Sequence, residues 1–387
     1  MTNLFIVTQF ISDHLDRASQ VDVIYTDWSK AFDRLNHQIL LGKLIRFGFS
    51  RSLVSLFGSL LSGRQQFVEN RGVRSPCSPV CSGVPQGSIF GPLLFNIFIN
   101  DLTDKLSVRH LLYADDLKLF CSVTSPADCM LLQRNLDNIL YDWTNENDLP
   151  LNVSKCNILS FYRIKQPILH SYTVDGTALS RVDRFSDLGV IFDTQLSFVP
   201  HIETLVSGCC KSMGFIIRNG GYFSPKVLLK LFNTFVRSRM EYASVIWSPC
   251  YEVHVGQLET VLRKFLKYLS FRCDGIYPEI GYPQEALLER FETSSLRQRR
   301  MYHSVVFLYK VVNYLIHCLS ISQQLVFNTP RSGARNQTVF YLPLAHTRAQ
   351  QWSPLYTMCR NYACVQHKVD LFSDQLSRIK SVFFGRM

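Results

Sequence analysis

Two adjacent carboxylates, Asp115 and Asp116, interrupt an otherwise apolar stretch of this chain, between LLY-A and LKLF. Like charges placed side by side repel each other, and neither gains from apolar burial. The short apolar runs on both sides predict two strands joined by a tight turn. We therefore predict a hairpin that carries the two carboxylates at its turn. A polar turn with no further role is the alternative for this pair taken alone.

A third carboxylate, Asp27, follows a β-rich run made of Val21, Val23, Ile24 and Tyr25. The apolar residues after it recur at helical spacing, which places Asp27 between a strand and a helix. For one lone Asp, a helix cap is the simpler interpretation. If the two strands are neighbours, however, three carboxylates converge on one edge of a sheet. Such a cluster suits hard divalent cations, and two Mg²⁺ ions about 3.5–4 Å apart can serve phosphoryl transfer.

The segment from Ser75 to Asn100 has no Asp, Glu, Lys or Arg, so it must be tested as a membrane span. It contains several prolines, and its dense apolar part, Ile89 to Ile99, is too short to cross a hydrocarbon core of about 30 Å. We interpret this part as a buried core helix entered by a tight turn at Pro85-Gln86-Gly87. No membrane association is expected.

Other elements follow from periodicity and capping. Ser50 is expected to cap a helix that runs through Leu61 and ends at Gly63, and residues 65–73 resemble a strand and turn. Residues 127–143 form an amphipathic pattern, with a predicted apolar face of Met130, Leu131, Leu132, Leu136, Ile139 and Leu140. Short strands are predicted up to about residue 193. From about Pro200 onward the pattern becomes helical.

The composition is that of a globular, basic protein. Of the 387 residues 47% are hydrophobic, and 41 Lys and Arg against 30 Asp and Glu give a net charge of +11. This excess indicates a polyanionic partner such as nucleic acid, or else a solvated basic surface. The 12 cysteines lack paired metal-ligand spacing, and the first residues lack a secretory leader pattern. We expect reduced cysteines and an intracellular protein, in the nucleus, the cytoplasm or both, that is not secreted.

Five motifs, in order, resemble those of reverse transcriptases encoded by non-LTR (LINE-like, jockey-related) retrotransposons, over roughly residues 2 to 195. They are YTDWSKAFDRLNH, SGVPQGSIFGPLLFNIFINDL, LLYADDLKLF, LPLNVSKCNILSF and FSDLGVIFD. The resemblance implies an α+β fold: a polymerase palm, with a small antiparallel sheet and packed helices, followed by a mainly helical thumb. It also implies an RNA-directed DNA polymerase that extends a DNA primer on an RNA template with deoxynucleoside triphosphates.

The resemblance also implies roles for the matching residues. Asp27, Asp115 and Asp116 would hold two Mg²⁺ ions, with Mn²⁺ as a substitute and the Trp28 carbonyl as a further ligand. Nucleotide contacts would come from Ala31, Phe32, Pro85, Gln86, Gly87 and Lys155. Phe32 would exclude a ribose 2′-hydroxyl, whereas a core aromatic is the alternative for that residue. Lys155 would approach the phosphates, or it is an exposed strand-end lysine.

Two further sets of residues lie outside the nucleotide pocket. The resemblance assigns Leu188, Gly189 and Val190 to the grip on the primer end. A thumb that tracks a duplex would contact the nucleic-acid backbone through basic clusters, which comprise Arg263, Lys264, Lys267, Arg297, Arg299 and Arg300. A solvated helix face is the alternative for each of these basic residues.

We predict a palm at 1–197 with a remnant of fingers at its N-terminus, a helical thumb or connection at 198–327, and a C-terminal region of open fold at 328–387. The fingers are expected to be largely absent, as in an N-terminally truncated copy. Three interpretations compete: an active polymerase, a weak or dead relic that binds RNA or RNA–DNA duplex, and another palm polymerase such as a group II intron maturase. The run Gly83 to Gly87 favours the retrotransposon branch, and Ala114 differs from the glycine usual in viral RNA replicases.

Overall fold

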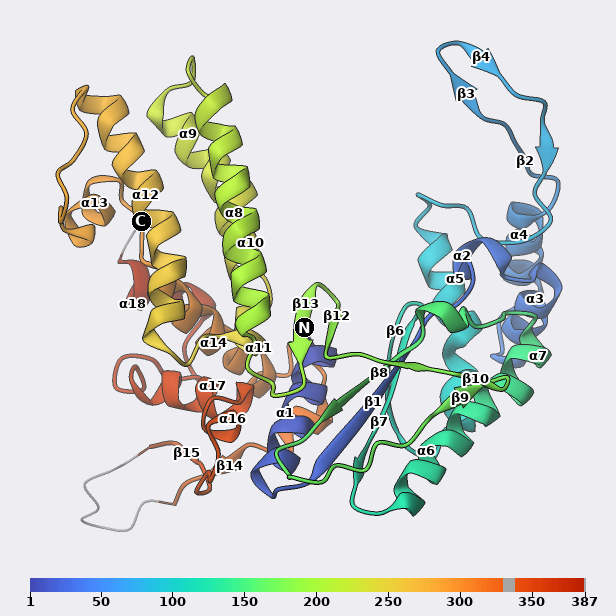
Figure 1. Cartoon of the computed structure of the whole chain (residues 1–387). Helices are drawn as coiled ribbons and strands as arrows, with labels where there is room; N and C mark the ends of the chain where they lie inside the picture. Colours follow the sequence, from blue (N-terminus) through green and yellow to red (C-terminus); the bar gives the residue numbers. More distant parts are fainter. Residues whose placement is uncertain (330–337, 386–387) are drawn as a thin grey trace. The chain divides into compact units, whose positions relative to one another are not determined.

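The structure is a computed structural model that describes residues 1–329 and 338–385. The chain divides into two compact units. One unit is Ser19–Asp183, and the other combines Met1–Ala18 with Arg184–Met387. The boundaries predicted at residues 197 and 327 stay predictions. The mixed content of sheet and helices confirms the predicted α+β class (Figure 1).

A five-stranded sheet in the order β11-β8-β1-β7-β6 forms the centre of the unit Ser19–Asp183. Every residue of its middle strand, β1, is buried, which explains the unbroken β-rich run of the sequence. Strands β1, β7, β8 and β6 pair antiparallel, and only β11 runs parallel to its neighbour β8. The bounds are β1 Gln20–Thr26, β6 Arg109–Tyr113, β7 Asp116–Val123, β8 Asn157–Phe161 and β11 Ser180–Arg181.

Helices and one extended hairpin complete this unit (Figure 1). The hairpin follows α4 and is built from β2 Gln65–Gln66, β3 Glu69–Asn70, β4 Val73–Arg74 and β5 Ser78–Pro79. The helices are α2 Ala31–Arg34, α3 His37–Arg46, α4 Arg51–Leu61, α5 Phe90–Ile99, α6 Pro126–Asp137 and α7 Thr144–Asn147, with 3-10 turns η1 Asn100–Lys105 and η3 Val153–Lys155 and a π-helical turn η2 Asn138–Trp143. A small pair, β9 Thr173–Val174 and β10 Thr177–Ala178, precedes β11.

Two helix predictions need correction and one is confirmed. The Ser50 side chain caps α4 as predicted, accepting a hydrogen bond from the Leu53 backbone. Helix α5 is not buried all round, because Phe90 and Leu93 are 44% and 49% exposed. On α6, Met130 and Leu131 were placed on the apolar face but are 54% and 41% exposed; the buried face is made by Cys129, Leu132 and Leu136. An apolar side chain on the open face of a helix needs no special explanation.

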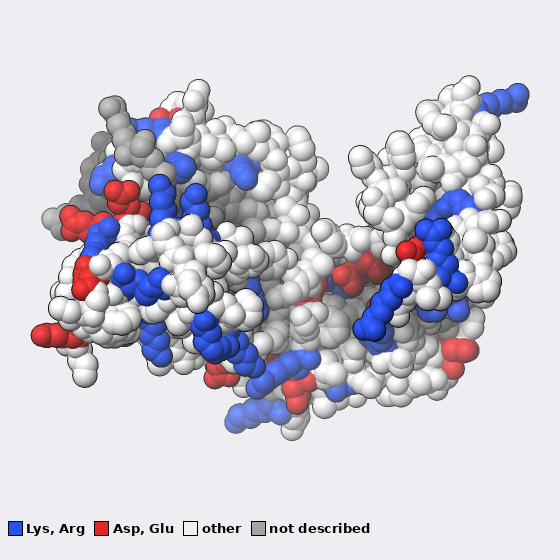
Figure 2. Space-filling model, turned by 90° about the horizontal axis from the view of Figure 1, so that it is seen from above, with Lys and Arg blue, Asp and Glu red and all other residues white. Residues whose placement is uncertain are grey.

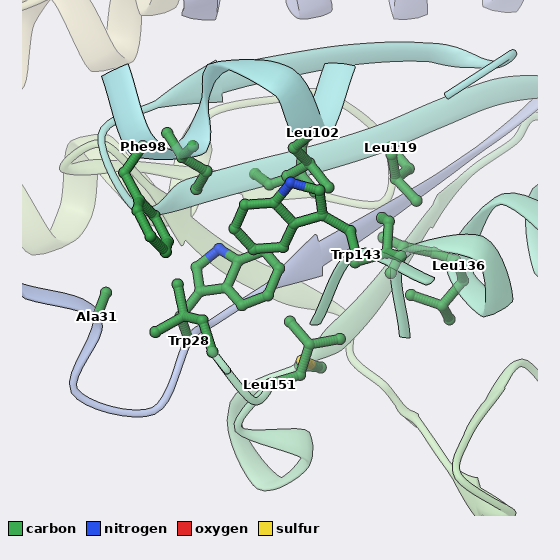
Figure 3. Close-up of a cluster of buried hydrophobic side chains, with 14 of the residues drawn as sticks. Trp28, Ala31, Phe98, Leu102, Leu119, Leu136, Trp143 and Leu151 are labelled. Carbon is green, nitrogen blue, oxygen red and sulfur yellow. The ribbon is translucent and has the colours of Figure 1, made fainter. Parts of the chain in front are cut away.

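The core of this unit is organised around two tryptophans (Figure 3). Trp28, which directly follows Asp27, meets Trp143 edge to face with ring centroids 5.2 Å apart. Phe98 of α5 packs against the same Trp143 ring at 6.0 Å. Edge-to-face pairs of this kind add to the gain from burial. The chain just after β1 is therefore anchored in the core.

A buried lysine, Lys43 of α3, lies beside these rings. Its Nζ donates hydrogen bonds to the Phe98 carbonyl at 2.6 Å and to Asp101 Oδ1 at 2.7 Å, and it lies 4.5 Å from the Phe98 ring centroid. The Trp143 Nε1 donates to the same carboxylate oxygen of Asp101 at 2.8 Å. Burial lowers the pKa of Lys43, and Asp101 opposes this effect. The side chains differ in burial, because Lys43 is 1% and Asp101 26% exposed.

Because Lys43 is more deeply buried than Asp101, removing either partner should change the free energy of unfolding by a different amount. We expect Asp101→Ala to reduce the free energy of unfolding by about 3–5 kcal/mol, because it leaves a buried cation without a carboxylate. Lys43→Met keeps the apolar stem and leaves a carboxylate that water can reach, so its cost is expected to be about 1 kcal/mol. Urea unfolding followed by tryptophan fluorescence measures both. The reverse order would show that Lys43 is not the buried partner.

The other unit is mainly helical, as predicted. Its helices are α1 Thr2–Asp16, α8 Val199–Asn219, α9 Pro225–Phe232, α10 Ser238–Glu241, α11 Ser244–Trp247, α12 Glu252–Asp274, α13 Gln284–Arg290, α14 Leu296–Val312, α15 Leu319–Ser322, α16 Arg348–Gln351, α17 Pro354–Ala363 and α18 Leu376–Phe384, with a π-helical turn η4 Asn233–Arg237. Its strands form two hairpins, β12 Arg184–Asp187 with β13 Val190–Asp193 and β14 Val326–Phe327 with β15 Phe340–Tyr341. No described helix of the chain is both long and apolar enough to cross a membrane.

The C-terminal region, whose fold the sequence left open, contains strand β15 and is mainly helical from Arg348 onward in its described part. Helix α17 packs on α14, and the backbone of Thr347 at the start of α16 donates to Asp16 of α1 at 2.6 Å. The first and last parts of the chain are thus joined within one unit. The stretch 330–337 lies outside the described residues.

His201, on α8, is buried at 7% exposure and packs edge-on against Trp247 at 5.1 Å. Its Nδ1 accepts a hydrogen bond from the Ile191 backbone at 3.3 Å. Burial lowers the pKa of His201 from 6.5 to about 4. Between pH 6.5 and 4 the imidazole binds a proton in the unfolded chain but stays neutral in the folded protein. Its contribution to stability is therefore complete above pH 6.5 and is lost as the pH falls towards 4.

We predict that this one group costs about 2 kcal/mol of unfolding free energy between pH 6.5 and 4.5. His201→Asn keeps an acceptor for the Ile191 amide and does not titrate, so its stability should fall less over that range. His317→Asn, at an exposed position after α14, is the control. Urea unfolding at several pH values measures the difference. Parallel pH profiles for wild type and His201→Asn would contradict the prediction.

Candidate active site

Asp27 lies immediately beyond the last residue of β1, as predicted. Its backbone carbonyl accepts a hydrogen bond from the Asn152 amide at 2.7 Å, and the Ser29 amide donates to the Pro150 carbonyl at 3.0 Å. Trp28, between them, forms a bridge with Leu151 and is 3% exposed. The chain is thus held on both sides of Asp27. Neither of these hydrogen bonds uses the Trp28 carbonyl, the expected further metal ligand.

The paired carboxylates lie at a hairpin turn, as predicted. Tyr113 of β6 pairs with Asp116 of β7, so Ala114 and Asp115 are the two residues of the turn. Ala114 has a positive φ of 53°, a backbone conformation found in tight hairpin turns. Thr26 pairs with Leu117, and its Oγ1 donates to the Leu117 carbonyl at 3.2 Å. Because the pairing is antiparallel, one step further along this ladder brings Asp27 beside Asp116.

The three carboxylates thus share one edge of the sheet through their backbones. Within the described parts of the chain, no three His, Cys, Asp or Glu side chains are gathered closely enough to hold a metal ion. Asp27 Oδ2 is shielded from solvent and accepts no hydrogen bond, although Lys155 Nζ lies 3.4 Å away. A shielded carboxylate oxygen beside a cation fits a metal ligand in charge and donor type. Side-chain rotation at this edge would be needed to close a cage.

Lys155 comes to this edge from η3, the short turn between Leu151 and β8. Its side chain is 65% exposed and that of Asp27 is 32% exposed. The ammonium group is therefore held beside a site carboxylate and is also open to solvent. This position agrees with a lysine that approaches the phosphates and also with the alternative, an exposed strand-end lysine.

Phe32 is half-buried and lies flat on Phe95 of α5, with ring centroids 4.3 Å apart and an interplanar angle of 25°. Ala31, one residue earlier, is 4% exposed. The predicted nucleotide-facing ring therefore cannot rotate freely, because α5 supports one of its faces. Phe95 was not among the residues predicted from the sequence, since only the fold brings it to Phe32.

The predicted turn at Pro85-Gln86-Gly87 is confirmed, with Gly87 at a positive φ of 79°. Ser88 leads into α5, and its Oγ accepts a hydrogen bond from the Gly91 amide at 2.9 Å. Upstream, Gly83 lies so close to the chain after β1 that an added Cβ would stand 2.7 Å from the Asp33 Cα. The turn and the segment from Phe32 to Leu35 are in direct backbone contact.

The predicted primer-grip residues lie in the other compact unit, at the turn between β12 and β13. Leu188 and Gly189 both have positive φ values, 45° and 80°, as a two-residue hairpin turn requires. The Tyr242 hydroxyl donates to the Leu188 carbonyl at 2.9 Å. Tyr242 supports this turn and was not found from the sequence, because the contact joins residues 54 positions apart.

The predicted backbone-contacting residues fall into two groups. Arg263 and Lys264 of α12 are exposed, and Lys267 donates to the Glu279 carbonyl at 2.6 Å. The α14 residues are less available: Arg297 pairs with Glu252, Arg299 pairs with Glu241, and Arg300 is 5% exposed, with no hydrogen-bond partner for Nη1 or Nη2 among the described residues. Figure 2 shows Lys and Arg in several separate groups on the face drawn. In this conformation Arg263 and Lys264 of α12 are the most accessible of the six, and the assignment of all six to the nucleic-acid backbone stays a prediction.

Glu241 explains why Arg299 is held inside. Burial alone would raise the pKa of Glu241, but hydrogen bonds from His303 and Arg299 outweigh it and lower the pKa to about 2. Arg237 adds a second guanidinium contact to Glu241 at 3.4 Å. A carboxylate surrounded in this way stays ionised and joins η4, α10 and α14. Arg299 therefore serves the fold of its own unit here.

A sheet edge that bears carboxylates, with an aromatic residue and a glycine turn beside it, is typical of a nucleotidyltransferase palm. The family model for reverse transcriptase (RNA-dependent DNA polymerase) matches residues 7–198. Through that region the chain belongs to the reverse transcriptase family, of the kind found in non-LTR retrotransposons. The resemblance recognised from the five motifs is confirmed.

Several curated relatives come from mobile elements. The RNA-directed DNA polymerase from mobile element jockey of Drosophila funebris is 27% identical over 71% of this chain and 32% of the relative. Its Drosophila melanogaster counterpart is 24% identical over 68% and 30%. A probable RNA-directed DNA polymerase from transposon BS of the same fly is 27% identical over 54% and 24%. The chain spans about a third or less of the length of these relatives.

Among solved structures, telomerase from Candida albicans is 13% identical, with 81% of this chain and 54% of that chain covered and a TM-score of 0.33. Apo telomerase from Candida tropicalis is 10% identical, covering 74% and 47%, with a TM-score of 0.37. Scores this low support no argument about this chain.

Two glycines of the turn region allow a matched test. We expect Gly83→Ala to reduce the free energy of unfolding by about 3 kcal/mol or more, because the new methyl group would meet backbone atoms that cannot move aside. Gly87 has a similar φ, but an added Cβ meets nothing within 4 Å. Gly87→Ala should cost about 1–2 kcal/mol, from backbone strain alone. Circular dichroism during urea unfolding measures both; equal losses would contradict the close packing of Gly83.

Proposed function

We propose that this chain is the catalytic core of an RNA-directed DNA polymerase that extends a DNA primer on an RNA template. The observation that carries the proposal is the pairing of Thr26 with Leu117, which brings Asp27 to the same sheet edge as Asp115 and Asp116. Phosphoryl transfer needs little covalent chemistry from the protein, so that charge placement and substrate positioning supply most of the rate.

Asp27, Asp115 and Asp116 would hold two Mg²⁺ ions, or Mn²⁺ in their place, with the Trp28 carbonyl as a further ligand. When bound, such ions polarise the reacting oxygens and neutralise charge on the leaving pyrophosphate. The protein's own part is to bring the three acids to one edge of the sheet. The anchoring of Asp27 between Asn152 and the buried Trp28 gives one ligand a fixed backbone position.

The deoxynucleoside triphosphate would lie beside Ala31 and Phe32, against the turn Pro85 to Gly87. Support for this placement comes from the Phe32 ring, which Phe95 backs at 4.3 Å. A ring held in this way can reject a ribose 2′-hydroxyl by steric contact, since it cannot turn aside. Lys155, 3.4 Å from Asp27, would meet the triphosphate and, in the proposed cycle, return a proton to pyrophosphate.

The primer end would rest on the turn formed by Leu188, Gly189 and Val190, which Tyr242 supports. The duplex backbone would be bound through Arg263, Lys264 and Lys267, with Arg297, Arg299 and Arg300 also assigned to it from the sequence. Contacts of this kind are independent of base sequence and weaken with salt.

A second candidate is a binding relic that grips RNA or RNA–DNA duplex without catalysis. The net charge of +11 fits this candidate as well as the first, and the described residues hold no ready-made metal cage. This candidate shares the duplex-binding surface of the first and differs only in the chemistry at the sheet edge.

Primer extension on an RNA template with Mg²⁺ and deoxynucleotides separates the two candidates. We expect extension by the wild-type chain and a loss of at least about 10³-fold in the Asp115→Asn/Asp116→Asn variant. Asp104→Asn/Asp142→Asn, which removes two exposed acids elsewhere in the same unit, is the charge-matched control and should retain activity. If the wild type and both double variants bind duplex in a salt-sensitive way but none of them extends the primer, the binding relic is supported.

A further inference from the structure

Two residues outside the predicted set tie the glycine turn to the segment after β1. His37, the first residue of α3, makes a hydrogen bond from Nε2 to the Gly83 carbonyl at 2.7 Å. Asp33 Oδ1 accepts a hydrogen bond from Gln86 Nε2 at 2.9 Å. Both contacts join residues that lie 46 or more positions apart in the chain. They therefore connect the two segments proposed to bind the nucleotide.

Backbone contacts place these side chains. The Gly83 amide donates to the Leu35 carbonyl at 2.8 Å, and the Val84 amide donates to the Phe32 carbonyl at 2.9 Å. The Ser82 Oγ adds a hydrogen bond to the Asp33 carbonyl at 2.8 Å. Because this ladder ends at Val84, it leaves Gln86 and Gly87 beyond its reach. The Asp33 side chain supplies the contact to that outer part of the turn.

In each of these two hydrogen bonds the donor and the acceptor are fixed by the groups involved. A backbone carbonyl only accepts, so His37 must carry its proton on Nε2. An ionised carboxylate also only accepts, so Gln86 must present its NH₂ group to Asp33. The amide oxygen of Gln86 is then turned away from Asp33, where it can accept a hydrogen bond from another group. Asp33 thus determines that the oxygen of the Gln86 amide, and not its NH₂ group, is available to a ligand.

Stability alone does not account for the Asp33–Gln86 contact. Both residues are exposed, and a hydrogen bond between exposed side chains contributes little to folding because water competes for both partners. Its main effect is to restrict the conformation of Gln86. Ordering a flexible side chain before a ligand binds improves affinity, because less freedom is lost on binding.

We propose that Asp33 and His37 are positioning residues for the incoming nucleotide. They hold the turn Pro85 to Gly87 against the Phe32 segment, so that Gln86 offers its amide oxygen to a hydrogen-bond donor of the deoxynucleotide. The inference rests on the proposed polymerase function, but it concerns nucleotide binding and not the chemical step. Neither residue needs to touch the nucleotide.

The test is the equilibrium affinity for a deoxynucleoside triphosphate, with Mg²⁺ and a primer–template whose primer ends in a dideoxynucleotide. The missing 3′-hydroxyl blocks chemistry, so binding is read alone. We expect Asp33→Ala and His37→Ala to weaken binding of the templated nucleotide about tenfold. Asp137→Ala is the matched control, because Asp137 accepts a hydrogen bond from Gln133 at 2.8 Å on α6, in the same unit. It should bind as wild type does.

A double-mutant cycle separates positioning from general damage. If Asp33 acts through Gln86, Asp33→Ala should weaken binding no further in a Gln86→Ala background. Full additivity, or wild-type affinity in Asp33→Ala, would overturn the proposal, as would a wild-type chain that binds no nucleotide. Nucleotide binding that depends on Asp33, in a wild-type chain that extends no primer, would refute the polymerase function and leave the positioning role intact.

Discussion

The antiparallel pairing of β1 with β7 is the constraint on which the rest of the site depends. Its register runs from Gln20 opposite Val123 to Thr26 opposite Leu117, and it decides that Asp27 emerges beside Asp116. A slip by one residue would exchange the two faces of the strand and place each buried side chain in packing that fits another. Because every residue of β1 is buried, that slip is costly, and the position of the acids follows from the core.

The segment after β1 is held from two directions. Trp28 turns into the core against Trp143, and four residues later Phe32 turns towards Phe95 of α5. The same α5 carries Phe98, which packs on Trp143 and whose carbonyl binds Lys43. One packed cluster therefore positions both Asp27 and the proposed nucleotide-facing ring. A change in that cluster would move both parts of the site together.

The sequence predicted what local pattern determines. The apolar runs around Asp115 and Asp116 specified the hairpin, Ser50 marked a helix start, and Pro85 to Gly87 marked a turn. It could not predict contacts that only the fold creates, such as His37 with Gly83 or Tyr242 with Leu188. Burial of charged groups was also hidden: Lys43 and Arg300 resemble surface residues by type, yet they are 1% and 5% exposed. Helical periodicity misplaced Met130 and Leu131 because it does not show which face of a helix is covered.

The site combines a rigid frame with one carboxylate oxygen, Asp27 Oδ2, to which the frame gives no hydrogen bond. Around Asp27 the backbone is fixed by hydrogen bonds, whereas its Oδ2 accepts none and lies 3.4 Å from Lys155. Carboxylates close together repel each other, and a fold gains nothing from them unless cations offset that repulsion. Lys155 can offset it only in part, since its side chain is 65% exposed. The remaining cost is what a cation-dependent site would carry when no cation is bound, and the buried ladder of β1 with β7 is what allows the fold to tolerate it.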